Sequence, residues 1–231
     1  MLLKYNIGGD KMEFDNKDNI RNLIIQKASE LFLKQGYTKT TIRQIADACN
    51  LGRGHLYYYF KKKEEIVLYL YKNLIEKIYA YIINHPNKYI DPLLSYAITQ
   101  YIYIKVIATN DDFFRMYIEA SEIYSIRKEY LKTLSDILNS NLKKLDYDFK
   151  KQDINLSLII GSAGEDTLLR RFYKKDIDLN LDEIIESTIK TRLLLLNINH
   201  EKVNEIILKT KEETKNIKIF DIIKSINIVD I

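Results

Sequence analysis

The spacing of apolar residues along the chain predicts helices almost throughout. Between residues 20 and 32, apolar side chains recur at intervals of three and four, which is the period of one helical face. Longer segments with apolar stripes or clear end signals are expected to form helices at about residues 63–84, 92–108, 111–125, 126–147, 153–175 and 181–196. Residues 197–231 add one more expected helix, followed by an Ile-, Lys- and Asn-rich tail.

The first seventy residues predict shorter helices with well-marked ends. Gly36 follows the first apolar stripe, where a glycine in the left-handed conformation commonly ends a helix. Thr41 and Gln44 have the spacing of a capping box, which begins a second helix. Asn50 is of a type that tolerates a positive φ, and Gly52 is placed to cap a third helix over about residues 53–60. Helix, short turn and helix is the form of a helix-turn-helix DNA reader.

Composition excludes several other classes of protein. Seven glycines and two prolines in 231 residues are too few for the many tight turns of a sandwich or barrel, so an all-α fold is expected. The single cysteine, Cys49, excludes an internal disulfide framework and suits a cytoplasmic location; we expect a small buried residue there rather than a redox sensor. Three scattered histidines lack metal-ligand spacing, so no metal and no cofactor are expected.

Neither export nor membrane insertion is expected from the sequence. No apolar run approaches the ~18 residues that a transmembrane helix needs. The N-terminus lacks the apolar run of a signal peptide. Translation from Met12 is one alternative; in the other, residues 1–11 form an extra arm that adds phosphate contacts through Lys4 and Lys11.

Positive charge is concentrated in one part of the chain. The net charge is +4, with twelve basic against eight acidic residues up to residue 70 and twenty-four of each afterwards. Between Arg43 and Lys63 there are five basic residues and one acidic residue. A basic patch on a neutral body favours a nucleic-acid partner, although a run of charge can also be a simple solvated face.

Two runs of residues at fixed spacing extend this pattern: GYTKTTIRQIA over residues 36–46 and LGRGHLYYYFKKKEE over residues 51–65. In these runs the chain resembles the TetR family of bacterial transcriptional regulators. The resemblance implies a homodimer of all-helical subunits, each with a three-helix DNA-binding head and a larger helical bundle for ligand binding and dimerisation. We therefore expect an N-terminal arm over residues 1–16, the helix-turn-helix domain over 17–62 and the bundle over 63–231.

The resemblance also assigns residues to the DNA. Arg53 and His55 begin the recognition helix and are the expected base readers, with Arg53 suited to bidentate pairing with guanine. Lys63 matches the family's phosphate-binding lysine, and phosphate contacts of this kind set the register without reading sequence. Gly52 stands where the family often has a Ser or Thr cap, and His55 where it has a small hydroxyl residue. The expected DNA-binding set is Thr41, Arg43, Gly52, Arg53, Gly54, His55, Tyr57, Tyr58 and Lys63.

Two further sites are expected in the bundle. Aromatic residues on the helices that line the family's pocket are candidates for ligand binding, or else ordinary core: Tyr96, Tyr101, Tyr103, Phe113, Tyr117 and Tyr124. The helices over 153–175 and 181–196 are candidates for the dimer interface, or else pack only within one subunit. The expected interface residues are Gly161, Gly164, Leu168, Ile185, Ile189 and Leu193.

The function implied is a repressor that leaves a pseudo-palindromic operator in double-stranded DNA when a small, largely apolar effector binds. The helix that begins at Lys63 is expected to couple the effector to the head. One alternative is a factor that keeps the head fold but binds a protein partner; another is a transcriptional activator. An enzyme is not expected, because no nucleophile–base pair, paired-carboxylate pattern or phosphate loop is found.

Overall fold

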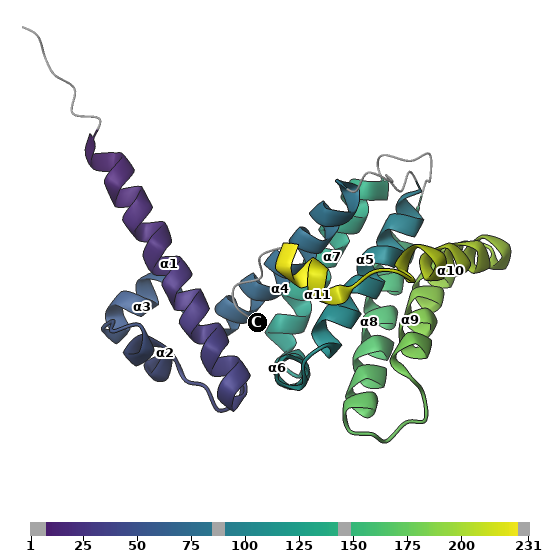
Figure 1. Cartoon of the computed structure of the whole chain (residues 1–231). Coiled ribbons are helices and arrows are strands. Elements are labelled where there is room, and N and C mark those ends of the chain that lie inside the picture. Colours follow the sequence, from purple (N-terminus) through teal and green to yellow (C-terminus); the bar gives the residue numbers. More distant parts are fainter. Residues whose placement is uncertain (1–7, 85–90, 143–148, 226–231) are drawn as a thin grey trace, which may run out of the picture.

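The computed structural model describes residues 8–84, 91–142 and 149–225, and every regular element within these ranges is a helix. Side chains are described for residues 17–82, 84, 91–136 and 149–224. A small head and a larger bundle lie side by side, with α4 leading from one to the other (Figure 1). The helices are α1 (Gly8–Gln35), α2 (Ile42–Ala48), α3 (Arg53–Tyr59), α4 (Lys63–Ile83), α5 (Pro92–Ala108), α6 (Asp111–Ser121), α7 (Tyr124–Leu142), α8 (Lys151–Tyr173), α9 (Leu181–Leu195), α10 (His200–Thr214) and α11 (Ile219–Ser225).

The head consists of α1, α2 and α3, and the end signals in the sequence set its turns. Gly36 has φ 90° and ends α1, as expected. Thr41 and Gln44 form the predicted capping box of α2, with side chain and backbone bonded in both directions. Asn50 takes the predicted positive φ, 54°, between α2 and α3. Side chains from all three helices and the turns close the core of the head: Ile24, Phe32, Tyr37, Ile45, Leu56 and Phe60.

The bundle is built around α5. Asp91 caps this helix by accepting hydrogen bonds from two backbone amides, and Pro92 occupies its first turn, where a missing N–H is tolerated. Twelve residues of α5 are buried, and they lie on all of its faces, because α4, α7, α9, α10 and α11 pack around it. None of the described helices is long and apolar enough to cross a membrane.

Helices α8 and α9 form a closely packed pair (Figure 1). A capping box between Asn180 and Glu183 begins α9 after the connecting turn. Ser157 on α8 donates a hydrogen bond of 2.8 Å to the carbonyl oxygen of Arg192 on α9. A Cβ atom at Gly161 would lie 2.3 Å from Arg192 Cγ, so this glycine makes room for a side chain of the same subunit.

Three boundaries differ from those expected. Helix α1 begins at Gly8, inside the segment expected to be an arm over residues 1–16; residues 1–7 lie outside the described part. The break between α6 and α7 falls at residues 122–123 rather than at 125–126. Residues 197–231 contain two described helices, not one, and α10 packs on α5 and α9 as part of the bundle.

Candidate nucleic-acid interface and effector site

Helix α3 presents one face to solvent and anchors the other in the head. Leu56 is fully buried, and Phe60, directly after the helix, is buried beside it. The residues expected to read DNA lie on the opposite side: Arg53 and His55 are exposed in the first turn, and Tyr57 and Tyr58 expose 43% and 61% of their surface. The structure therefore brings these four predicted side chains to one free face.

The two glycines of α3 leave its beginning open. Gly52 caps the helix without a side-chain hydrogen bond, and no other part of the chain comes within 4 Å of a Cβ atom placed at Gly52 or Gly54. Thr41 and Arg43 are also exposed, on and beside the start of α2. The Arg43 guanidinium makes only a long, exposed contact of 3.8 Å with Asp47, which contributes little and leaves it available.

Two basic residues on α1 extend this surface, although the sequence analysis did not select them. The ammonium of Lys17 lies 4.9 Å from the ring centre of Tyr58, and Tyr58 in turn packs edge-on against Tyr59. The guanidinium of Arg21 lies 4.3 Å from the ring centre of Tyr69 on α4. Their spacing of four residues on one helix is the only signal in the sequence that points to a shared face.

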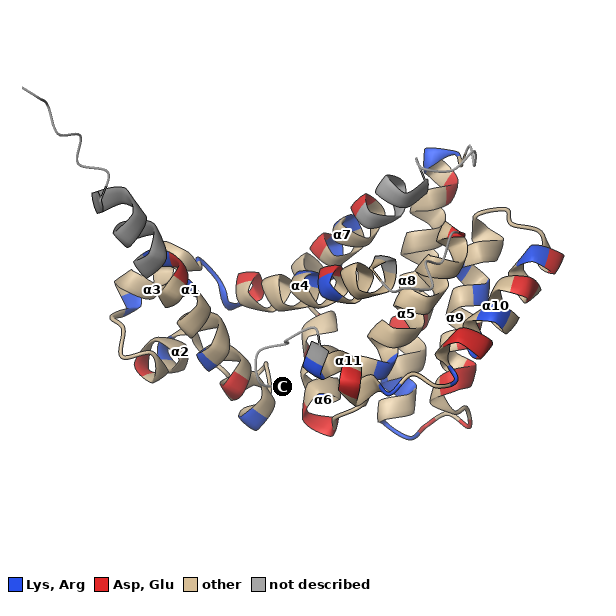
Figure 2. Ribbon diagram, turned by 45° about the horizontal axis from the view of Figure 1, so that its top comes forward, with Lys and Arg blue, Asp and Glu red and all other residues tan. Residues whose placement is uncertain are grey.

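Lys63 lies in a different setting from the one expected. Its ammonium donates hydrogen bonds to the carbonyl oxygens of Tyr37 (2.8 Å) and Thr40 (2.9 Å) and lies 4.1 Å from the ring centre of Tyr37. Partial burial lowers its pKa. Two of the three N–H donors of this group are thus used within the protein, and they fix the start of α4 to the turn between α1 and α2. The loop before it, Lys61 and Lys62, is exposed and drawn blue in Figure 2.

The helix-turn-helix coincides with a match to a known family. Residues 24–70 match the model of "Bacterial regulatory proteins, tetR family". The helix-turn-helix head is thus that of the TetR family. This match covers all of α2 and α3, the end of α1 and the start of α4, which is the region that carries the exposed face.

Curated proteins that are similar to this chain are transcriptional regulators. The uncharacterized HTH-type transcriptional regulator YuxN of Bacillus subtilis is 29% identical over 101 residues, which span 44% of this chain and 35% of that protein. The icaADBC biofilm operon negative regulator IcaR of Staphylococcus epidermidis is 29% identical over 156 residues, 61% of this chain and 79% of that one. The match to YuxN thus spans about a third of that protein's length.

Solved structures share the fold of most of this chain. RolR in complex with resorcinol has a TM-score of 0.62 at 15% identity, covering 84% of this chain and 95% of that one. Thermus thermophilus FadR in complex with lauroyl-CoA has a TM-score of 0.53 at 18% identity, covering 77% and 93%. The all-α architecture of a helix-turn-helix head with a larger helical bundle is therefore confirmed.

Helix α6 makes a second connection between bundle and head. Arg115 donates from Nη2 to the carbonyl oxygen of Leu33, 2.5 Å away near the end of α1. Glu119, one turn later, accepts a hydrogen bond of 2.7 Å from the backbone N–H of Thr38. A Cβ atom at Gly36 would come within 2.8 Å of the same carboxylate. No local pattern predicts this connection, because it joins segments about eighty residues apart.

The six aromatic residues expected to bind ligand do not share one cavity. Tyr101 lines a groove of about 420 Å³ among α5, α9, α10 and α11, and Phe113 lines another of about 480 Å³ among α1, α4 and α6. Tyr117 lines a small cavity of about 20 Å³ inside the bundle. Tyr124 is 78% exposed on α7, so its assignment to a pocket was wrong. Tyr103 is buried in the interior of the bundle, and Tyr96 on the same helix is half-buried against it.

A buried ion pair lies at the centre of the bundle. Nη2 of Arg192 on α9 lies 3.0 Å from Oε2 of Glu165 on α8, and the two side chains are 0% and 1% exposed. Arg192 also donates to Tyr96 (3.0 Å) and Ser162 (2.9 Å), and Gln100 donates to Glu165 (2.5 Å). Burial raises the pKa of Glu165, and the facing guanidinium opposes that rise. Removing either charge would leave the other buried without a counterion.

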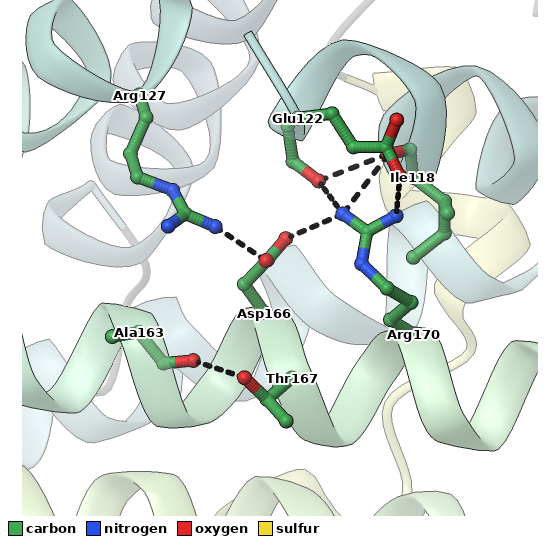
Figure 3. Close-up of polar contacts among 8 residues, drawn as sticks. Ile118, Glu122, Arg127, Ala163, Asp166, Thr167 and Arg170 are labelled. Carbon is green, nitrogen blue, oxygen red and sulfur yellow. Dashed lines mark hydrogen bonds and ion pairs between the residues drawn. The ribbon is translucent and has the colours of Figure 1, made fainter. Parts of the chain in front are cut away.

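Next to this pair, Asp166 holds a second, more open cluster (Figure 3). Its carboxylate forms ion pairs with Arg127 on α7 and with Arg170, one turn further along α8. Arg170 reaches on to Glu122 at 2.6 Å and to the backbone carbonyl of Ile118 at 3.3 Å. The cluster therefore ties α6, α7 and α8 together beside the small cavity.

Most of the residues expected at the dimer interface are buried within the subunit. Ile185, Ile189 and Leu193 on α9 are at most 1% exposed, and Gly161 faces Arg192. Leu168 is half-buried, and Gly164 is exposed with open space around it. The apolar stripe of α9 thus points inward, which is the alternative that the sequence left open. The exposed apolar row of the pair is on α8 instead: Leu156, Ile159 and Ile160 expose 42%, 56% and 47%.

Proposed function

We propose that this TetR-family chain is a ligand-responsive transcriptional repressor that binds a pseudo-palindromic operator as a homodimer. The observation that carries the proposal is the free face of α3, where Arg53, His55, Tyr57 and Tyr58 are exposed at the head of a helix-turn-helix. Arginine suits guanine in the major groove, and tyrosine hydroxyls suit phosphates. The basic residues of the 61–62 loop flank the same face and would hold the DNA backbone.

A second copy of the chain is the proposed occupant of the exposed row on α8. The exposed apolar residues of α8 recur at the spacing of one helical face: Leu156, Ile159, Ile160 and Ala163. Gly164, beside them, has no side chain to hinder the approach of another helix. Three large exposed apolar side chains on adjacent turns favour burial against another protein surface. Pairing of α8 with its symmetry mate places the two heads for two half-sites about one DNA turn, or a multiple of it, apart.

The effector would act through α4 and α6. Lys63 fixes the first turn of α4 to the head, and Arg115 and Glu119 fix α6 to the end of α1 and the following turn. A ligand that binds better to one arrangement of these helices than to another shifts the head spacing by that difference in affinity. Resorcinol and lauroyl-CoA, found with two proteins of this fold, support a small-molecule effector and differ too much to fix its chemistry.

The test is selection of binding sites from a random double-stranded DNA library, followed by affinity measurements on the selected duplex. The proposal predicts an enriched pseudo-palindrome with two half-sites. Arg53→Ala should weaken binding about 10- to 100-fold and relax preference at one base pair of each half-site. Lys174→Ala, which removes an exposed charge from the turn after α8, is the matched control and should bind as the wild type does. Absence of any enriched sequence, with a folded dimer, would contradict the proposal.

A further inference from the structure

Four tyrosines from four helices meet inside the bundle. The ring of Tyr71 on α4 lies 6.0 Å from that of Tyr117 on α6, and Tyr103 on α5 stacks on Tyr130 on α7 at 5.9 Å. All four side chains are buried. Burial raises the pKa of each phenol far enough that it keeps its proton in the physiological range. The cluster therefore offers neutral hydroxyl groups.

Several polar atoms of this cluster have no hydrogen-bond partner among the described residues. They are the hydroxyls of Tyr71, Tyr103 and Tyr130 and the Nε of Arg192, the arginine that pairs with Glu165. The hydroxyls of Tyr103 and Tyr130 lie near enough to interact with each other, whereas that of Tyr71 has no such neighbour in the described part of the chain. Buried polar groups are paired in the great majority of cases, and unpaired ones are few in a whole domain. Tyr71 and Tyr130 line the same small cavity, so their hydroxyls mark a place that another molecule can complete.

The charges beside the tyrosines already balance one another. Glu165 faces Arg192, and Asp166 faces Arg127 and Arg170, the second of which also pairs with Glu122 (Figure 3). A charged ligand would add a buried charge with no counterion left to meet it. A neutral ligand adds none. Ring faces from the tyrosines favour a flat aromatic molecule over a flexible chain.

The cavity beside the tyrosine rings is small in this conformation. The cavity lined by Tyr71, Tyr117 and Tyr130 has a volume of about 20 Å³, which is room for one water molecule. Tyr103 and Arg192 do not line this cavity, so a single water there cannot also pair with their polar atoms. A larger occupant has to move Tyr71 and Tyr117 apart. Those residues stand on α4 and α6, the two helices that are bonded to the head.

We infer that this tyrosine cluster is the effector site and that it takes a small, neutral aromatic molecule carrying hydroxyl groups. The inference rests on the proposed function and differs from the largely apolar effector that the sequence led us to expect. The ligand hydroxyls would pair with Tyr71, Tyr103 and Tyr130, and its ring would pack between theirs. Opening the cluster would displace α6 from the head.

Calorimetric titration of the full chain, without DNA, tests the site directly. The probes are phenol and resorcinol, with toluene as the analogue lacking a hydroxyl, benzoate as an anion and benzyltrimethylammonium as a cation. We expect the hydroxylated probes to bind at least tenfold more tightly than the other three. Tyr71→Phe and Tyr130→Phe should each weaken the hydroxylated probes about tenfold, the affinity equivalent of one buried hydrogen bond. Tyr124→Phe, at an exposed site, is the matched control and should change nothing.

The stability of the same variants separates an unfilled site from ordinary packing. If the hydroxyls are unpaired in the free protein, both Phe variants should unfold at the same or a higher denaturant concentration than the wild type. Lower midpoints for both, together with no binding of phenol or resorcinol, would show a hydroxyl network satisfied by trapped water only and overturn the inference. Binding that is unchanged in both variants would place the ligand in another groove and overturn it as well.

The failure of this inference and that of the proposed function are distinguishable. Phenol or resorcinol binding that depends on Tyr71 and Tyr130, with no DNA selected from a random library, would support this site and contradict the repressor. Selection of a pseudo-palindrome whose complex is released by toluene or benzoate and not by the hydroxylated probes would support the repressor and overturn the ligand class proposed here.

Discussion

Glu119 on α6 accepts a hydrogen bond of 2.7 Å from the backbone N–H of Thr38, which lies in the turn between α1 and α2. This bond joins the bundle to the helix-turn-helix directly. A Cβ atom at Gly36 would lie 2.8 Å from the same carboxylate and would have to displace it. Together with Lys63, Glu119 therefore bonds the bundle side of the molecule to the turn that precedes α2.

Loss of the Glu119 carboxylate should uncouple head and bundle. Glu119→Ala removes the acceptor of the Thr38 N–H. Because this is one exposed hydrogen bond, we expect operator affinity to remain within about threefold of the wild type. The change in operator affinity that the effector causes should fall by more than half. Glu129→Ala, an exposed residue on α7, is the matched control. Unchanged effector response in Glu119→Ala, measured by fluorescence anisotropy of a labelled operator, would show that coupling runs elsewhere.

Two glycines on one helix should respond to alanine in opposite ways. A Cβ at Gly161 meets Arg192 at 2.3 Å, in the stem of a side chain held in an ion pair, so Gly161→Ala should destabilise the fold by about 1–3 kcal/mol. Gly164 has open space and lies three residues further along α8, so Gly164→Ala should stabilise an isolated subunit by up to about 1 kcal/mol. Denaturant unfolding of the two variants measures both effects.

Gly164→Ala also tests the proposed dimer surface. If α8 meets its symmetry mate at this residue, the added methyl group weakens the dimer, and sedimentation velocity should detect more monomer at low protein concentration. Ile160→Asp, which places a charge in the exposed apolar row, should give a larger shift to monomer with unchanged helix content. A dimer that persists in Ile160→Asp would place the interface on another face.

The buried pair of Arg192 and Glu165 should behave as a unit. Arg192→Met leaves Glu165 without a counterion, so we expect a loss of about 3–5 kcal/mol at neutral pH, and Arg192→Met with Glu165→Leu should recover most of it. In the single variant, burial keeps the folded pKa of Glu165 above the unfolded value. The loss of folding stability caused by the unpaired Glu165 carboxylate is therefore absent below the unfolded pKa. It develops as pH rises from the unfolded pKa toward the folded pKa. The stability difference from wild type should shrink between pH 7 and pH 5; a constant difference would contradict this account.

Cys49 should be inert in the folded protein. Its side chain is 6% exposed between α1 and α2, and burial raises the pKa of its thiol. We expect reaction with a disulfide reagent to be at least tenfold slower than in guanidinium chloride, and Cys49→Ala to leave DNA binding unchanged. Rapid reaction of the native thiol, or loss of DNA binding on oxidation, would favour a redox sensor instead.

Local rules were sufficient to predict the head from the sequence. Each end signal of the head depends only on residues within one turn: the positive φ of Gly36, the positive φ of Asn50 and the capping box of Thr41. The predicted helix ends therefore agree with those of the structure. The exposed face of α3 follows from the same local pattern, because only Leu56 faces inward. The setting of Lys63 could not be predicted from local pattern. The carbonyl oxygens that its ammonium bonds belong to a turn more than twenty residues earlier, and sequence spacing does not reveal that contact.

The bundle was predicted less well, because its decisive contacts join distant segments. Periodicity shows that α9 has an apolar stripe but not whether that stripe faces its own core or a second subunit, and Ile185 and Ile189 proved to face the core. The pairing of Arg192 with Glu165 accounts for Gly161, and neither charge has a local partner that would have marked it. Tyr124 keeps the helical spacing of the other aromatic residues and still points to solvent.

The dependence of operator affinity on salt tests the central claim, binding of DNA by the exposed face of α3, most directly. With the selected duplex, a plot of log affinity against log salt concentration should be linear, with a negative slope of several units for a dimer that contacts phosphates from both heads. Lys61→Ala with Lys62→Ala should make this slope shallower by about two to four units and leave the selected sequence unchanged. A flat plot for the wild-type protein, or equal affinity for every duplex at each salt concentration, would contradict the account.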